Sequence, residues 1–312
     1  MYSAALKQLN HLLSLNTTQT SDEVVLAVAA LAISECLVPS GRRSCLEHMM
    51  GLQKLMQLRD PGTFWSLRSR GFCEGVRFLV VFGSLQCKTP CILARSDWRE
   101  SLRVICPPEL LQVQELWDIL ASCSVLIARR ESIMSTLEPS NREQWEDIRR
   151  HGSLLLERVY ALRETEPHFH TQQDEPRFCG PGRESTPGST AEPEVDQVML
   201  YNTALIEVLQ FLSPISLAGN TSEKTLWAEE MRLAAIQSCQ VIRNYLSNKR
   251  FIDASFPPLI HMSLAAAWNH LRYDESDEGI WLRELLTEKG RQVVANGLWA
   301  TYQWLNSLSE SD

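Results

Sequence analysis

The sequence predicts an all-α fold, a multi-helix antiparallel array with one disordered linker. Apolar residues recur at helical spacing through most of the 312-residue chain. No segment shows the sustained alternation of apolar and polar residues that is typical of a strand. Pro, Gly, Ser, Thr and acidic residues gather in one stretch, 167–194. We therefore expect an N-terminal helical part (1–166), the linker (167–194), and a C-terminal helical part (195–312) that packs on the first.

The chain begins with an amphipathic pattern over Met1 to Leu15, from which we expect the chain to start within the folded domain. A second helix follows, in which Thr20 and Glu23 stand at the spacing of a capping box. No side chain from Val24 to Ile33 is polar. A helix with no polar face must be surrounded by other helices, so we expect this one to be covered on all sides.

The next helical pattern runs from Arg42 to Arg59 and contains Gly51. A glycine inside a helix costs about 1 kcal/mol relative to alanine, so its presence predicts the close approach of a neighbouring helix. Gly83 is expected to weaken the end of the helix after that. We expect an irregular connection over Leu85 to Pro108, which contains three prolines. Further helices are predicted over Phe64 to Ser84, Glu109 to Leu137, Ser140 to Glu164, Val195 to Leu212, Glu223 to Asn248, Pro257 to Leu271 and Glu278 to Leu308.

Several of these segments resemble the fungal-specific transcription factor domain. In the N-terminal part they are Ser21-Asp22-Glu23 with the helix through Glu35, His48 to Leu55, and Leu58 to Pro61. Further along they are Lys88-Thr89-Pro90, Cys106 to Leu111, and Tyr201 to Ile206. The resemblance covers most of the chain and rests on apolar patterns. It implies a helical regulatory region of the kind that usually follows a zinc binuclear cluster in fungal regulators.

The chain departs from that family at the DNA-binding module. A zinc binuclear cluster requires six closely spaced cysteines that begin with a Cys-x-x-Cys step. This chain has nine cysteines and no Cys-x-x-Cys. Its formal net charge of -8 also argues against direct nucleic-acid binding, which depends on basic side chains that neutralise phosphates. We expect no nucleic-acid binding by the chain alone and no membrane association.

Metal and catalytic sites are not predicted. Two groups of side chains are weighed as metal ligands and set aside: Cys87, Cys91 and Cys106, and the linker residues His168, His170, Asp174 and Cys179. No nucleophile elbow, phosphate-binding loop, dinucleotide fingerprint or His-Glu-x-x-His motif occurs. We therefore expect a protein that is not an enzyme and has no cofactor, no catalytic residue and no metal.

Four residues are candidate contacts for an effector or a partner: His48, Gly51, Arg77 and Trp98. The alternative for His48 is a core histidine hydrogen-bonded to a neighbouring carbonyl or to Glu35. A further set of arginines is expected either to attract an anionic effector or to form ion pairs. That set is Arg77, Arg95, Arg99 and Arg103.

The resemblance and the missing motifs together predict a regulator of transcription that lacks its own DNA-binding module. It is expected to act through protein partners, including other regulators or a second copy of the chain, or through a small effector. The expected place is the nucleus, with the cytoplasm as the alternative, and the expected targets are metabolic or secondary-metabolite genes. One alternative is an enzyme or small-molecule binder of a biosynthetic pathway that reuses the helical scaffold, with a pocket near His48, Trp98 and the second half. Another is the regulatory part of a zinc-cluster activator whose first exon lies upstream.

Overall fold

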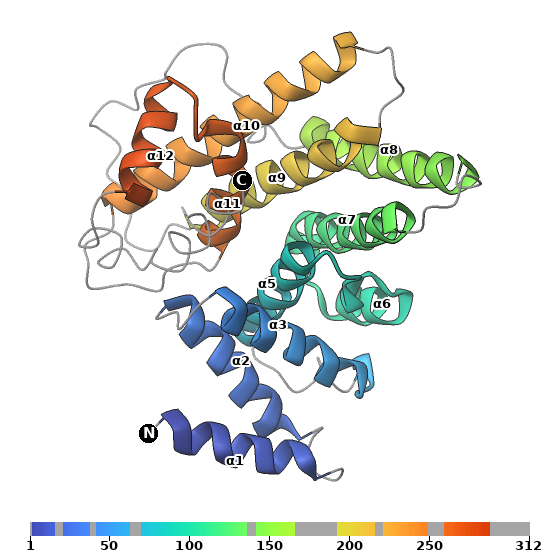
Figure 1. Cartoon of the computed structure of the whole chain (residues 1–312), viewed down its shortest axis with the longest axis vertical. Coiled ribbons are helices and arrows are strands. Elements are labelled where there is room, and N and C mark those ends of the chain that lie inside the picture. Colours follow the sequence, from blue (N-terminus) through green and yellow to red (C-terminus); the bar gives the residue numbers. More distant parts are fainter. Residues whose placement is uncertain are drawn as a thin grey trace.

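A computed structural model of the chain describes residues 2–15, 21–37, 42–62, 70–135, 142–165, 192–215, 221–248 and 259–287. These residues form eleven α-helices and no strand, which confirms the predicted all-α fold. The helices are α1 (Tyr2–Ser14), α2 (Asp22–Leu37), α3 (Arg42–Gln57), α5 (Arg70–Cys87), α6 (Ser96–Ile105), α7 (Leu111–Ser135), α8 (Arg142–Thr165), α9 (Glu192–Leu212), α10 (Thr221–Asn248), α11 (Leu259–Leu271) and α12 (Asp277–Thr287) (Figure 1).

Most helices pack against the helices that precede and follow them in the chain, so that the array extends from α1 at one end to α12 at the other (Figure 1). Two long helices join the two halves. α7 packs on α5, α8 and α9, and α9 packs in addition on α8, α10 and α11. The N-terminal and C-terminal helical parts therefore meet where α9 packs on α7 and α8.

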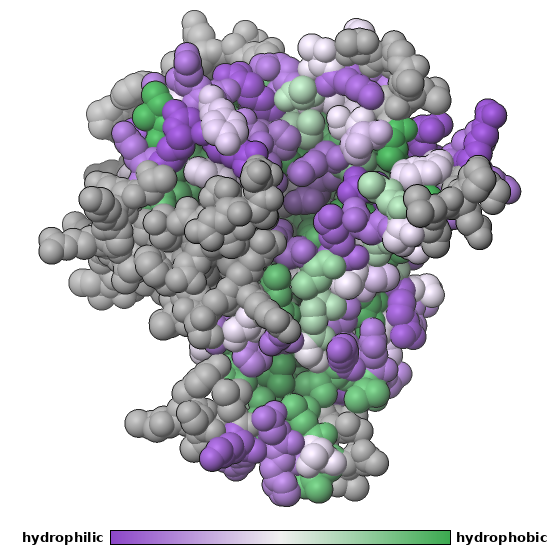
Figure 2. All heavy atoms as spheres, viewed as in Figure 1, coloured by the Kyte–Doolittle hydropathy of each residue, from purple (hydrophilic) through white to green (hydrophobic). Residues whose placement is uncertain are grey.

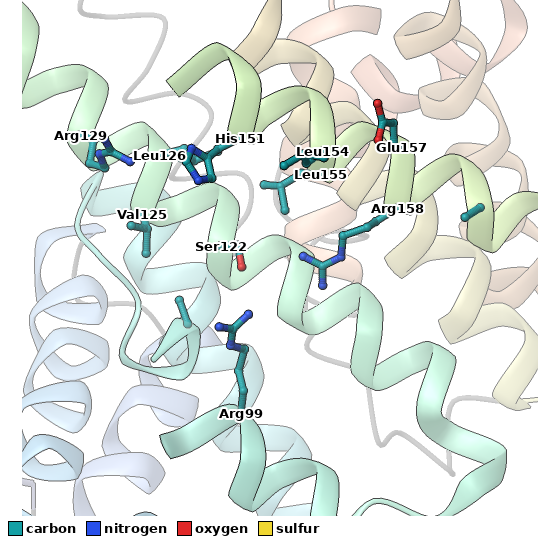
Figure 3. Close-up of a pocket in the computed structure, with 12 residues that line it drawn as sticks. Arg99, Ser122, Val125, Leu126, Arg129, His151, Leu154, Leu155, Glu157 and Arg158 are labelled. Carbon is teal, nitrogen blue, oxygen red and sulfur yellow. The ribbon is translucent and has the colours of Figure 1, made fainter. Parts of the chain in front are cut away.

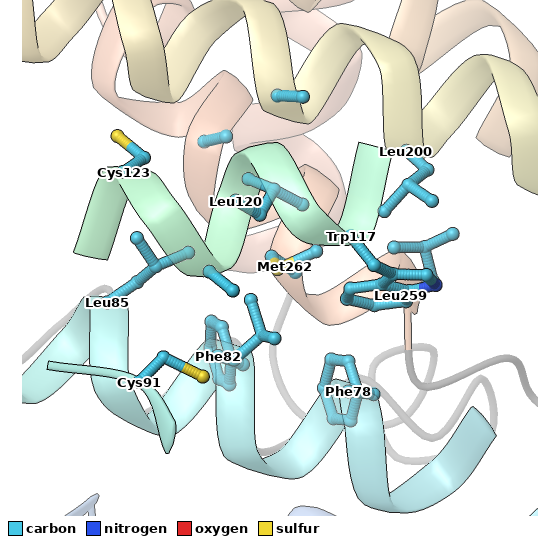
Figure 4. Packing of buried hydrophobic residues seen from close by; sticks show 14 of the residues in the cluster. Phe78, Phe82, Leu85, Cys91, Trp117, Leu120, Cys123, Leu200, Leu259 and Met262 are labelled. Atoms are coloured by element: carbon cyan, nitrogen blue, oxygen red, sulfur yellow. The ribbon is translucent and has the colours of Figure 1, made fainter. Parts of the chain in front are cut away.

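The centre of the core is built by α5, α7, α9 and α11 (Figure 4). Phe78 and Phe82 of α5 stack with ring centroids 5.4 Å apart, below Trp117 and Leu120 of α7. Leu200 of α9 lies on the other side of α7 in the same cluster. Each of these side chains is buried, and burial of apolar area is the main stabilising contribution in a helical array.

Two helices are long and apolar enough, by length and composition, to cross a membrane: Pro108–Ser135, which includes α7, and Val195–Ile215, which includes most of α9. In this structure 61% and 78% of their most apolar windows are buried. Both helices lie at the centre of the array in this structure.

The segment predicted to be an irregular connection contains a helix instead. Within Leu85 to Pro108 the structure has a 3-10 turn, Ile92–Ala94, and the ten-residue helix α6. Trp98 and Leu102, four residues apart, are the buried positions of α6. The prediction was wrong because the prolines of the segment were taken to exclude a helix, whereas all three lie outside Ser96–Ile105, and Trp98 and Leu102 stand at helical spacing within it.

The two glycine predictions are also wrong. A Cβ atom added at Gly51 would meet no atom within 4 Å, so no neighbouring helix approaches α3 there. Gly83 makes that approach instead, because its Cβ would lie 2.8 Å from the Cβ of Met49 in α3. Helix α5 continues past Gly83 to Cys87. Gly83 therefore serves the packing of α3 on α5, and it does not end the helix.

Helix α2 is not covered on all sides. Leu26 and Ile33 of its apolar run are 46% and 39% exposed, and Ala30 between them is exposed as well. Figure 2 shows hydrophobic atoms at the surface in the lower part of the molecule, where Figure 1 places α1 to α3. The prediction failed because α2 lies near one end of the array and packs mainly on α3.

Two further predictions fall largely outside the described residues. The predicted linker lies outside them except for Glu192 to Glu194, with which α9 begins. The predicted helix from Glu278 to Leu308 is described only as far as Thr287.

Candidate functional site

The candidate site is a pocket at the junction of α6, α7 and α8, with a cavity volume of about 680 Å³. We call it the arginine pocket. Its wall contains Arg99 of α6, residues of α7 from Ser122 to Arg129, and residues of α8 from His151 to Ala161, together with Ala94. Pockets of this size hold small organic ligands.

Much of the wall is apolar. α7 contributes Val125 and Leu126, and α8 contributes Leu154 and Leu155. Leu154 lines the pocket, and its side chain is 49% exposed. A leucine left accessible in a concave site provides apolar area that a ligand can cover.

Cationic side chains stand at both ends of this apolar wall. Figure 3 shows Arg99 and Arg158 pointing from opposite helices toward the same space beside Ser122, while Arg129 and His151 lie at the other end. Two guanidinium groups directed at one space repel each other unless an anion lies between them.

Arg129 and Arg158 form ion pairs in which the carboxylates are shared. Arg129 Nη2 lies 2.7 Å from Asp147 Oδ2, and Asp147 also pairs with Arg150 at 2.6 Å. The hydrogen bonds from these two arginines lower the pKa of Asp147, so its carboxylate stays ionised. Arg129 therefore already has a carboxylate partner at this end of the pocket, and Arg150 shares that carboxylate.

The same arrangement occurs at the other end. Arg158 Nε lies 2.7 Å from Glu115 Oε1, and Arg103 Nη2 lies 2.8 Å from Glu115 Oε2. Arg103 also donates to Asp118, which is buried and whose pKa is raised by that burial. Arg103 therefore links α6 to α7 through ion pairs with Glu115 and Asp118. Arg158, which also pairs with Glu115, lines the pocket.

Arg99 differs from these arginines. Among the residues that the structure describes, its side chain makes no hydrogen bond and no ion pair. It is half-buried and lines the pocket. An unpaired guanidinium presents its full set of donors to an incoming carboxylate or phosphate.

The pocket also contains a serine and a histidine, Ser122 and His151, but they do not form a nucleophile and base. The Ser122 hydroxyl donates to the backbone oxygen of Asp118 at 2.7 Å, and no hydrogen bond joins Ser122 to His151 within the described residues. The Nδ1 atom of His151 lies 2.8 Å from the backbone oxygen of Asp147. Nucleophilic catalysis requires the hydroxyl to be bonded to its base, so this geometry supports binding.

None of the four residues proposed from the sequence as contacts lines the arginine pocket. His48 is half-buried on α3 and makes no hydrogen bond to Glu35 or to a carbonyl among the described residues. Gly51 lies beside open space on α3, and Arg77 is buried on α5. Trp98 is fully buried beneath α6. The structure places them on three helices, α3, α5 and α6, and their role as contacts stays a prediction.

The arginines weighed from the sequence divide into paired and unpaired members. Arg95 pairs with Asp97 at 2.7 Å, and Arg103 pairs with Glu115 and Asp118. Only Arg99 of the predicted set lines the pocket. Arg129 and Arg158 were not among the sequence candidates. The apolar pattern of a helix does not show which of its polar residues will face a neighbouring helix.

Metal-binding geometry is not found in the part of the chain that the structure describes, where no three His, Cys, Asp or Glu side chains are grouped. Burial raises the pKa of the Cys91 thiol to about 12, which opposes the thiolate form that a metal requires. The predicted linker cluster of His168, His170, Asp174 and Cys179 lies outside the described residues.

Comparison of the chain with protein-family models, with curated proteins and with solved structures finds no match.

Proposed function

We propose that this chain is a regulatory protein that binds a small anionic effector in the arginine pocket and acts on transcription through protein partners. The observation that carries the proposal is Arg99, an unpaired arginine beside an apolar wall in a cavity of about 680 Å³. The class of effector is an amphipathic carboxylate or phosphate ester. Its acidic group would lie between Arg99 and Arg158, and its apolar body would cover Val125 and Leu154.

The position of the pocket supports regulation. Its wall is made by three helices that follow one another in the chain, and the short helix α6 packs on α7. A ligand that contacts all three favours the arrangement in which they lie together. Binding therefore stabilises one position of α6, and a partner that contacts that surface would respond to it.

The assignment to transcription rests on the resemblance of the sequence to the fungal-specific transcription factor domain. The acidic charge of -8 and the missing zinc-cluster motif agree with action through partners such as other regulators or a second copy of the chain. A place in the nucleus and control of metabolic genes are expectations of the same resemblance. The competing possibility remains a binder or enzyme of a biosynthetic pathway.

The first experiment tests effector binding with 2-naphthoate, a carboxylate on an apolar ring frame, by titration calorimetry. We expect saturable binding that weakens about tenfold or more in Arg99→Gln, since a charge-assisted hydrogen bond contributes about 1.5 to 3 kcal/mol. The control is Arg243→Gln, which removes an exposed arginine of α10 that has no ion pair among the described residues. Equal affinity in the wild type and Arg99→Gln contradicts the proposal.

The second experiment tests regulation in cells. Deletion of the gene should change a defined set of transcripts, and Arg99→Gln should reproduce the change while the protein is present at normal level. Loss of one metabolic intermediate with all transcripts unchanged would instead favour the enzyme.

A further inference from the structure

A second pocket lies on the other side of α8, between α8, α9 and α10, with a cavity volume of about 520 Å³. Its lining includes Tyr160 and Arg163 of α8, Asn202 and Leu205 of α9, and Leu226 and Leu233 of α10. We call it the amide pocket, after Asn202. Arg158 and Tyr160, two residues apart on α8, line different pockets because side chains at that spacing point to different faces of a helix.

Asn202 is the unusual residue of this pocket. It is 1% exposed, and its side-chain amide nitrogen has no hydrogen-bond partner in the part of the chain that the structure describes. Buried amide groups are nearly always hydrogen-bonded, because a donor removed from water without an acceptor costs folding free energy. Because Asn202 lines the cavity, an oxygen of a molecule that enters it can supply the missing acceptor once the amide turns toward that oxygen.

The charges of the amide pocket, in contrast, are satisfied within the protein. The Tyr160 hydroxyl donates to Glu230 at 2.7 Å, and Arg163 lies 3.6 Å from the same carboxylate. Glu229 pairs with Arg232 at 3.2 Å. Burial raises the pKa of Tyr160, so the phenol keeps the proton with which it binds Glu230. An anionic ligand would find no free cation here, and a cationic ligand would have to compete for carboxylates already bound.

The remaining wall is apolar. Leu205 and Ala234 are buried at its base, and Leu226 is 66% exposed at α10. Such a wall can cover the body of an apolar ligand.

We propose that the amide pocket binds a neutral, largely apolar molecule with a carbonyl or hydroxyl oxygen, which accepts a hydrogen bond from Asn202. The ligand class differs from that of the arginine pocket. The proposal goes beyond the proposed function and does not depend on it.

The test uses 2-acetylnaphthalene, a neutral ketone with the same ring frame as 2-naphthoate. We expect saturable binding to the full chain by titration calorimetry, together with a shift of the Asn202 side-chain amide resonances in ¹⁵N-labelled protein. Asn202→Leu should weaken the ketone at least tenfold. The matched control is Asn244→Leu, the same change at an exposed position of α10, which should leave the affinity unchanged.

Two further measurements distinguish the loss of a ligand contact from a loss of folding. Asn202→Leu should melt at a temperature no lower than the wild type, since an apolar side chain of similar size replaces a donor without a partner. Leu226→Gln alters only the exposed part of the wall, so it should leave the melting temperature unchanged and weaken the ketone severalfold.

The contrary outcomes are distinct from a failure of the proposed function. No saturable binding of the ketone would mean that Asn202 holds only a water, and a lower melting temperature of Asn202→Leu would mean that the residue is structural. Loss of ketone binding in Arg99→Gln with retention in Asn202→Leu would place the ketone in the arginine pocket. Each of these outcomes overturns the amide pocket as a ligand site. None of them bears on whether the wild-type protein binds 2-naphthoate in the arginine pocket.

Discussion

The two pockets beside α8 differ in which polar group is left without a partner. In the arginine pocket the Ser122 hydroxyl is bonded, and two charged side chains, Arg99 and Glu157, have no ion pair among the described residues. In the amide pocket the ionic groups are paired and a neutral donor, Asn202, is unsatisfied. We therefore expect a charged ligand in the first pocket and a neutral ligand in the second, because an unsatisfied group gains most from a ligand that pairs with it.

Both pockets depend on the position of α8, and Gly152 decides that position. A Cβ atom at Gly152 would lie 2.7 Å from Leu212 Cδ2 and 2.9 Å from Phe211 Cε1 of α9. Gly152→Ala is expected to reduce the free energy of unfolding by about 2 to 3 kcal/mol, because the added methyl group forces α8 away from α9. Urea unfolding measures the loss. Binding of 2-naphthoate and of 2-acetylnaphthalene should both weaken, and unchanged binding of both would show that the pockets do not need this contact.

Two carboxylates, Glu207 of α9 and Asp147 of α8, should change stability in opposite directions as the pH rises. Burial raises the pKa of Glu207, a half-buried residue of α9, to about 7, so the folded protein holds a proton that the unfolded chain releases. The free energy of unfolding is therefore highest below the unfolded pKa of about 4.3 and falls by about 1.4 kcal/mol for each pH unit as the pH rises from there to about 7. Glu207→Gln should remove this fall in urea unfolding measured from about pH 5 to about pH 8.

Asp147, beside the arginine pocket, is the control for that pH dependence. Its pKa is lowered by hydrogen bonds from Arg129 and Arg150. Its contribution is present above its unfolded pKa of about 3.9 and is lost as the pH falls through the lower folded value. Asp147→Asn should thus leave the profile between about pH 5 and about pH 8 unchanged. A profile that Glu207→Gln does not alter would contradict the role given to burial.

Arg99 and Arg103, four residues apart on α6, should separate binding from stability. Arg103→Gln is expected to reduce the free energy of unfolding by about 1 to 2 kcal/mol, because it leaves the buried carboxylate of Asp118 without its cation. Arg99→Gln should change it by about 0.5 kcal/mol or less, since no ion pair is lost. Unfolding in urea, with 2-naphthoate titrations on the same samples, checks both. A large stability loss in Arg99→Gln would mean that this arginine is structural.

A change that should stabilise the protein lies away from both pockets. Gly51→Ala on α3 adds a methyl group into open space and restores helix propensity, so it should raise the free energy of unfolding by about 0.5 to 1 kcal/mol. Neither ligand should bind differently. A decrease in stability would show that a neighbour approaches α3 at this position after all.

Sequence reasoning found most helices because their apolar faces repeat over several turns, as in α7 and α9. It missed α6, whose buried face consists of Trp98 and Leu102 alone. It also selected the wrong glycine for a close approach, since helix propensity treats Gly51 and Gly83 alike. Of the residues that line the arginine pocket it named Arg99, and it gave no reason to separate Arg99 from the paired Arg95 and Arg103.

By itself the sequence determined the fold class, because the period of apolar residues is a local property of each helix. It also determined the acidic charge of the chain. Only the tertiary structure decided which arginine is unpaired, which glycine touches a neighbour and that Asn202 is buried beside a cavity. These properties depend on which helices meet and at which turn. Contacts between distant segments cannot be read from the spacing of apolar residues in the sequence.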